Sequence, residues 1–174
     1  IIGNTAASNE QHGILLYSCS GNTFSDNTIS KSYDGVALYK SEDNVIRGNT
    51  VLNNEMGIWL YESTNNSISG NIIANNDYDG MSLFESSNNS IYGNNIKANY
   101  WEGIWLFNSS NNIIHGNNIT ANYYSGIIFS ESSNCNIIYG NNITNNGRSI
   151  WLESSSNNII YHNNFINNTV QAYA

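Results

Sequence analysis

Two carboxylic acids, Asp79 and Glu102, occupy equivalent positions in consecutive sequence repeats, and each stands directly before a glycine. If such repeats stack in parallel register, their backbones lie about 4.8 Å apart. Carboxyl groups about 5 Å apart can carry out retaining glycoside hydrolysis, and more widely spaced pairs inverting hydrolysis. Asp79 and Glu102 are therefore the catalytic candidates of this sequence. A solvated acidic edge is the favoured competing interpretation, because no basic residue joins the pair in an obvious way.

Aromatic residues form a second candidate site. Tryptophan recurs from 59 to 105 and from 105 to 151, which is every second repeat. Two strand spacings would place successive indoles about 9.6 Å apart. Such a column can cover the sheet, form a protein–protein face or offer a platform to a glycan. The candidate binding surface comprises Trp59, Trp105, Trp151, Tyr61, Phe84, Phe107 and Trp101.

These side chains belong to sequence repeats of 22 to 24 residues, and asparagine occurs at three positions of the repeat. The three columns are Asn22, Asn44, Asn66, Asn89, Asn112, Asn136 and Asn158; Asn4, Asn27, Asn49, Asn71, Asn94, Asn117, Asn141 and Asn163; and Asn9, Asn54, Asn76, Asn99, Asn122, Asn146 and Asn168. A fixed period above about 20 residues indicates a solenoid. Because an amide both donates and accepts hydrogen bonds, we expect these side chains to bond to neighbouring coils or to corner backbone.

Between the asparagines, apolar residues alternate at a period of two, which is typical of short strands with one buried face. In one such segment we expect Ile104 and Leu106 inside and Trp105 outside. The preceding Gly103 and its counterparts are expected to adopt positive φ or to allow close backbone approach. A leucine-rich repeat would need a leucine-dominated pattern. The sequence instead predicts an all-β, single-stranded right-handed parallel β-helix of about seven coils, as one domain spanning 1–174.

The amino-acid composition limits the classes of partner that this chain can bind. The chain has a formal net charge of −8, so it lacks the basic stripe that would neutralise nucleic-acid phosphates. No apolar run approaches the roughly 20 residues of a membrane span, so membrane insertion is not expected. Cys19 and Cys135 lie five coils apart and are not expected to pair. His12, His115 and His162 fall in different columns, so neither a metal site nor a cofactor is expected.

The unit Asn-Asn-x-Ile-x-Gly-Asn-x-Ile-x-x-Asn-x-x-x-Gly-Ile-x-Leu resembles the parallel β-helix repeats of the NosD-like and carbohydrate-binding/sugar-hydrolysis (CASH) group. The resemblance extends from Ile1 to about Asn168. It implies the β-helix fold and an extracellular or cell-surface protein of archaea or bacteria. It says little about function, because the motif residues belong to the scaffold. NosD-like proteins are associated with copper-site maturation, which the scattered histidines of this chain do not support.

Neither end of the chain shows a recognisable cap. The repeat phase is already established at Ile1, and only 169–174 follow the last coil, as a short tail. We therefore predict a non-enzymatic extracellular structural solenoid that self-associates head to tail into a filament or envelope layer. The alternative is a polysaccharide-binding or polysaccharide-cleaving module with a cell-surface polysaccharide as partner. Six sequons are candidate glycosylation sites, at Asn65, Asn88, Asn108, Asn118, Asn142 and Asn167.

Overall fold

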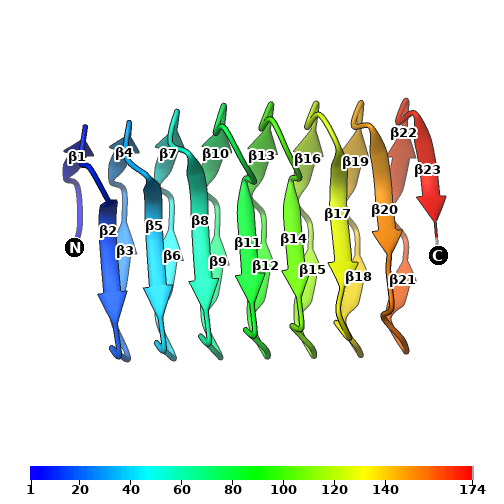
Figure 1. Ribbon diagram of the computed structural model, residues 1–174, viewed down its shortest axis with the longest axis horizontal. Coiled ribbons are helices and arrows are strands. Elements are labelled where there is room, and N and C mark those ends of the chain that lie inside the picture. Colours follow the sequence, from blue (N-terminus) through cyan, green and yellow to red (C-terminus); the bar gives the residue numbers. More distant parts are fainter. Residues whose placement is uncertain (174) are drawn as a thin grey trace.

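Three parallel β-sheets wrap around one axis in the computed structural model, which describes residues 1–173 (Figure 1). The β1 sheet contains β1 (Thr5–Ala7), β4 (Thr28–Ser30), β7 (Thr50–Leu52), β10 (Ile72–Ala74), β13 (Asn95–Lys97), β16 (Asn118–Thr120), β19 (Asn142–Thr144) and β22 (Asn164–Ile166). The β2 sheet contains β2 (His12–Tyr17), β5 (Asp34–Tyr39), β8 (Met56–Tyr61), β11 (Met81–Phe84), β14 (Ile104–Phe107), β17 (Ser125–Ser130), β20 (Arg148–Leu152) and β23 (Val170–Tyr173). The β3 sheet contains β3 (Thr23–Ser25), β6 (Val45–Arg47), β9 (Ser67–Ser69), β12 (Ser90–Tyr92), β15 (Ile113–His115), β18 (Ile137–Tyr139) and β21 (Ile159–Tyr161).

Each strand pairs in parallel with its counterparts in the coils before and after it, so like residues stack on like. Leu106, for example, pairs with Leu83 on one side and with Phe129 on the other. Ile104 and Leu106 are fully buried, and Trp105 between them lies half-buried on the outer side. The predicted alternation and the all-β parallel solenoid of about seven coils are therefore confirmed.

The asparagine columns form hydrogen-bond ladders inside the corners of the coils. Asn94, which is 1% exposed, is representative. Its Oδ1 accepts the backbone N–H and the side-chain amide of Asn71, at 3.0 and 2.9 Å. Its own amide donates to Asn117 Oδ1 at 3.0 Å and to the carbonyls of Ile68 and Tyr92. Each asparagine thus satisfies backbone groups that the tight corners would otherwise leave unpaired.

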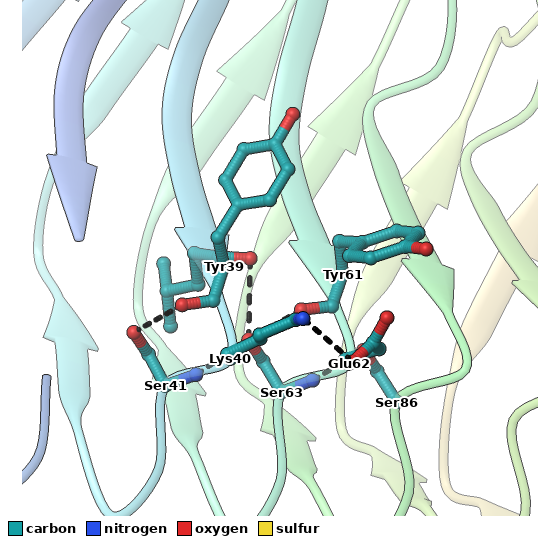
Figure 2. Close-up of polar contacts among 8 residues, drawn as sticks. Tyr39, Lys40, Ser41, Tyr61, Glu62, Ser63 and Ser86 are labelled. Carbon is teal, nitrogen blue, oxygen red and sulfur yellow. Dashed lines mark hydrogen bonds and ion pairs between the residues drawn. The ribbon is translucent and has the colours of Figure 1, made fainter. Parts of the chain in front are cut away.

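A fourth ladder, built from serine, was not predicted from the sequence pattern. Its members include Ser41, Ser63, Ser86, Ser109 and Ser133, all buried. Ser63 Oγ accepts the backbone N–H of Ser41 at 3.1 Å and donates to the Tyr61 carbonyl at 2.9 Å (Figure 2). Beside this ladder, Lys40 and Glu62 form an exposed ion pair at 3.5 Å. A serine fits here because its short hydroxyl reaches a carbonyl only two residues earlier.

A glycine in most coils of the β2 sheet sets the direction of the neighbouring side chains. A Cβ on Gly80 would lie 2.8 Å from the carbonyl oxygen of Gly103 and would also clash with a core isoleucine. Of the two roles expected for these glycines, close approach is confirmed and positive φ is wrong. Positive φ belongs to other glycines, namely Gly3, Gly21, Gly48, Gly70, Gly93, Gly116 and Gly140. Because Gly80 and the next residue, Met81, both face the core, Asp79 and Ser82 both lie on the outer side.

The segment 169–174, expected as a short tail, contributes a strand. Residues 170–173 form β23, which pairs in parallel with β20 and extends the β2 sheet by one strand. Residue 174 lies outside the described residues. Within residues 1–173, the structure has no helix long and apolar enough to cross a membrane.

Candidate functional site

The outer surface of the β2 sheet, which faces the viewer in Figure 1, gathers most of the candidate side chains. Two columns run side by side along it, three residues apart within each coil. The first column contains His12, Asp34, Met56, Asp79, Glu102, Ser125 and Arg148. The second contains Leu15, Ala37, Trp59, Ser82, Trp105, Ile128 and Trp151. The register therefore sets a column of titratable groups beside the tryptophan column.

A cleft of about 300 Å³ opens on this surface, within the size range of small-ligand sites. It lies where the coil of β17 contributes only Ser125 and Ile128 to the two columns. The coils on either side contribute Trp105 and Trp151, so the shorter side chains between them leave a hollow. The cleft is lined by Trp101, Glu102, Trp105, Tyr124, Ile128, Arg148 and Trp151.

The indole of Trp105 is held by three contacts. Its Nε1 donates a hydrogen bond to Ser130 Oγ at 2.9 Å. The rings of Phe84 and Phe107 stack on each other with centroids 4.1 Å apart, and they meet the indole at 84° and 86°. The hydrogen bond engages the polar edge of the indole. Trp105 is thus fixed in the wall of the cleft before a ligand arrives, which lowers the entropic cost of binding.

Arg148 supplies the positive charge of the cleft. Its guanidinium lies over the Trp151 ring, 4.3 Å from the ring centroid, which is a cation–π contact. The expectation that no basic residue joins the acidic pair is wrong, because Arg148 lines the same cleft as Glu102. The two charged groups stand two coils apart in one column, with only the short side chain of Ser125 between them.

Asp79 and Glu102 are adjacent, as expected, but only Glu102 lines the cleft. Asp79 is 1% exposed. Its Oδ2 accepts the hydroxyl of Ser82 at 2.6 Å, and its Oδ1 accepts the backbone N–H of Glu102 at 3.0 Å. Burial, followed by the charge of Asp79 and a hydrogen bond to it, raises the pKa of Glu102 to about 8. Burial raises the pKa of Asp79 as well, while its hydrogen bonds from Ser82 and Glu102 act in the opposite direction. Because these hydrogen bonds favour an ionised carboxyl group at Asp79, we assign the proton of the pair to Glu102.

This geometry changes what the acidic pair can do. Both glycosidase mechanisms need two carboxyl groups that reach the sugar from opposite sides of the bond to be cleaved. Asp79 is covered by its own neighbours, so it positions Glu102 and does not touch a ligand. At neutral pH the pair therefore offers the cleft a neutral carboxyl group, whose proton is directed to Asp79 and whose carbonyl oxygen can accept one hydrogen bond.

We expect the fold to lose stability as Glu102 ionises. The folded pKa of about 8 exceeds the ordinary value of 4.5, so the folded state holds this proton more tightly than the unfolded chain. The resulting stabilisation is complete below the ordinary value and is lost as the pH rises through the folded pKa. The urea midpoint of the wild-type protein should fall between about pH 5 and about pH 9, and Glu102→Gln should flatten this fall. If the urea midpoint falls equally steeply with pH in the wild-type protein and in Glu102→Gln, another group is responsible for the pH dependence.

Two further hollows continue the cleft along the solenoid axis. One, of about 510 Å³, shares Trp101 with the cleft and is lined by Glu55, Asp77, Tyr78, Tyr100 and Trp101. The other, of about 310 Å³, shares Tyr124 and Arg148 and is lined by Tyr123, Tyr124, Gly147, Arg148, Thr169 and Val170. Five coil steps, about 24 Å in all, separate Glu55 from Thr169. The cleft and the two hollows are called the aromatic groove below.

Some of the predicted aromatic residues lie outside this groove. Trp59 packs against Tyr39 and Tyr61, with ring centroids 5.0 and 6.2 Å away. Phe84 and Phe107 support Trp105 and do not line the cleft. Three predicted residues do line it, namely Trp101, Trp105 and Trp151.

Three residues of the cleft were missed from the sequence. Tyr124 could have been found, since it follows Trp101 in the same corner column. Arg148 could have been found only by aligning it with Glu102 across the intervening coil. Ile128 gave no sign of its role, because an isoleucine between larger aromatic residues is ordinary in a strand.

A histidine–carboxyl pair also lies in the first column, outside the groove. His12 Nδ1 stands 2.7 Å from Asp34 Oδ2, and Asp34 is 1% exposed. Burial raises the pKa of Asp34, while the charge of His12 and a hydrogen bond from it act in the opposite direction. Neither residue lines the cleft or the two hollows of the groove, so we assign the pair a role in the stability of the first coils.

The six sequon asparagines differ in their surroundings. Asn118 and Asn142 are half-buried and hydrogen-bonded in an outward ladder that begins at Asn95, with contacts of 3.0 Å. The other four are exposed, at Asn65, Asn88, Asn108 and Asn167. Glycosylation at any of the six stays a prediction.

Comparisons with known proteins agree on the fold. The family model described as "Right handed beta helix region" matches residues 1–137 and 102–174. Among solved structures, the periplasmic alginate epimerase AlgG is similar with a TM-score of 0.90 and 25% identity, over 93% of this chain and 44% of that one. The A-module of mannuronan C-5 epimerase AlgE4 from Azotobacter vinelandii gives a TM-score of 0.81 at 16% identity, over 99% of this chain and 56% of that one. The Dettilon tailspike protein gives a TM-score of 0.82 at 21% identity, over 90% of this chain and 36% of that one. No curated protein sequence matches.

These findings confirm the right-handed parallel β-helix and correct the functional expectation. The prediction of a purely structural, self-assembling solenoid is wrong, because the similar structures include enzymes named for alginate and mannuronan. They favour the polysaccharide alternative. The chain spans about half the length of these structures, or less.

Proposed function

The chain belongs to the right-handed β-helix family, and we propose that it binds a polysaccharide chain in the aromatic groove of the β2 sheet. The polymer lies along the solenoid axis, with a sugar ring on Trp105. At the centre of the groove, Arg148 donates a hydrogen bond to the sugar and Glu102 accepts one. Because Asp79 is buried, binding is a better-supported role for this groove than hydrolysis by paired carboxyl groups.

The fixed indole of Trp105 is the observation that carries this proposal. An aromatic ring held at three points and bordering an open groove offers an apolar face at little entropic cost. Three other aromatic side chains border the same cleft, namely Trp101, Tyr124 and Trp151. Hollows that share their walls let a long polymer pass through, whereas a closed pocket would accept only a short ligand.

The proposal includes a location and a subgroup. An extracellular or cell-surface location would expose the groove to cell-surface polysaccharide, and the similarity to a periplasmic protein and to a tailspike supports this setting. The NosD-like or CASH subgroup stays a prediction that rests on the sequence repeat alone.

Affinity electrophoresis through gels that contain soluble polysaccharides tests the proposal. We expect at least one polysaccharide to retard the protein in a saturable way, with a matching change in tryptophan fluorescence in solution. A chemically diverse panel in which no polysaccharide causes retardation or a fluorescence change would remove the basis for this function.

A further inference from the structure

We propose that the aromatic groove selects a neutral, hydroxyl-rich polysaccharide and disfavours polyuronates. This inference rests on the proposed polysaccharide binding and adds the chemical class of the polymer. The fold likeness to alginate epimerases does not decide this class, because a shared fold does not fix the charges that line a groove.

The first argument is the count of charges along the groove. Among the described residues that line the cleft and its two hollows, Arg148 is the sole cation. Glu55, Asp77 and Glu102 line the same path. A polyuronate carries a carboxylate on every ring, so a chain that follows the groove would bring several anions past one guanidinium.

The position of the charges makes the mismatch larger. Glu55 and Asp77 stand at the end of the groove away from Arg148. The next hollow, which shares both residues, adds one further carboxyl group, Glu10, and one cation, Lys31, so carboxyl groups still outnumber cations along the path. The formal net charge of the chain is −8, and charges separated by less than the Debye length of about 8 Å are only partly screened at physiological salt. A polyanion therefore meets repulsion over much of the groove.

The second argument is that the same residues suit hydroxyl groups. Ionised Glu55 and Asp77 accept hydrogen bonds, and sugar hydroxyls can donate them. Arg148 is a donor, to which hydroxyl or ring oxygens can bond, and the carbonyl oxygen of protonated Glu102 can accept from a hydroxyl group. The walls between these polar groups are aromatic, with Trp105 fixed in place. Such a lining pairs apolar ring faces and hydroxyl groups without requiring a charge on each sugar.

Isothermal titration of the whole protein against matched polysaccharides tests the inference. The polyuronates are alginate and polygalacturonate, and the neutral polymers are galactomannan, mixed-linkage β-glucan, xylan without uronate substituents and dextran. Titrations run at physiological salt, once with calcium and once with a chelator. We expect at least one neutral polymer to bind at least about tenfold more tightly than either polyuronate.

A single charge change sharpens the test. Asp77→Asn should raise the affinity for polygalacturonate at least about threefold, because it removes an anion from the groove. Asp43→Asn is the matched control, since Asp43 is exposed, lies at a distant corner and loses the same charge. Asp43→Asn should change the affinity for polygalacturonate by less than about half of the change caused by Asp77→Asn.

The outcomes separate the inference from the function on which it rests. A polyuronate that binds as tightly as every neutral polymer, with or without calcium, overturns the inference and leaves polysaccharide binding intact. The absence of binding to all six polymers removes both. An equal gain from Asp77→Asn and Asp43→Asn would assign the repulsion to net charge and overturn the role given to the groove.

Discussion

Replacing Trp105 with alanine is expected to weaken polysaccharide binding at least about tenfold, which is a loss typical of a buried tryptophan at the centre of an interface. The reason is the fixed indole, whose hydrogen bond to Ser130 and edge contacts with Phe84 and Phe107 hold it in the cleft wall. Isothermal titration with the polymer that binds most tightly measures the loss.

The chain supplies two matched controls for this change. Trp59 occupies the same column two coils away but packs against Tyr39 and Tyr61 outside the groove, so Trp59→Ala should change the affinity less than about twofold. Ser130→Ala removes the hydrogen bond that holds the indole, together with a longer one from Ser130 Oγ to the Leu106 carbonyl, and it should give an intermediate loss. If Trp59→Ala and Trp105→Ala weaken binding equally, the ligand does not lie in the groove.

The largest expected effect on stability comes from Asn94→Leu, at roughly 3–5 kcal/mol. Leucine has a similar volume but can form none of the five hydrogen bonds of this side chain. The change leaves the backbone N–H of Asn71 without its acceptor in a buried corner, and it removes one donor each from the Ile68 carbonyl and from Asn117 Oδ1. Urea denaturation followed by circular dichroism measures the free energy of unfolding.

Asn164→Leu is the control for this substitution. Asn164 lies exposed on β22, and its side chain takes no part in the ladders. Its replacement should change the free energy of unfolding by less than about 0.5 kcal/mol. A similar small change at Asn94 would show that coil stacking needs no amide ladder.

The scaffold could be predicted from the sequence because its rules are strictly periodic. An asparagine such as Asn94 repeats at fixed intervals, and its neighbours repeat with it, so one coil predicts the next. The serine ladder was missed for a physical reason. Serine is common in turns, so Ser63 and its counterparts resemble ordinary loop residues until the backbone shows that each hydroxyl is buried.

The groove was only partly predictable because it depends on a break in the repeat. Simple alternation would place Glu102 and Arg148 on the same side as Ile104 and Ile150, inside the solenoid. The tight backbone approach at Gly103 interrupts the alternation, so Glu102 lies outward. Buried Ser149 takes the same place after Arg148, which also lies outward. The cleft also depends on the small side chain of Ser125, which leaves an open space between the larger side chains of the neighbouring coils.

The central claim is that a polysaccharide lies in the aromatic groove. A crystal structure with an oligosaccharide of the tightest-binding polymer tests it most directly. We predict a sugar ring on the indole of Trp105, with the chain running along the solenoid axis past Trp101 on one side and Arg148 on the other. Sugar density on Trp59, or on the β1 or β3 sheet, with the groove empty, would contradict the account.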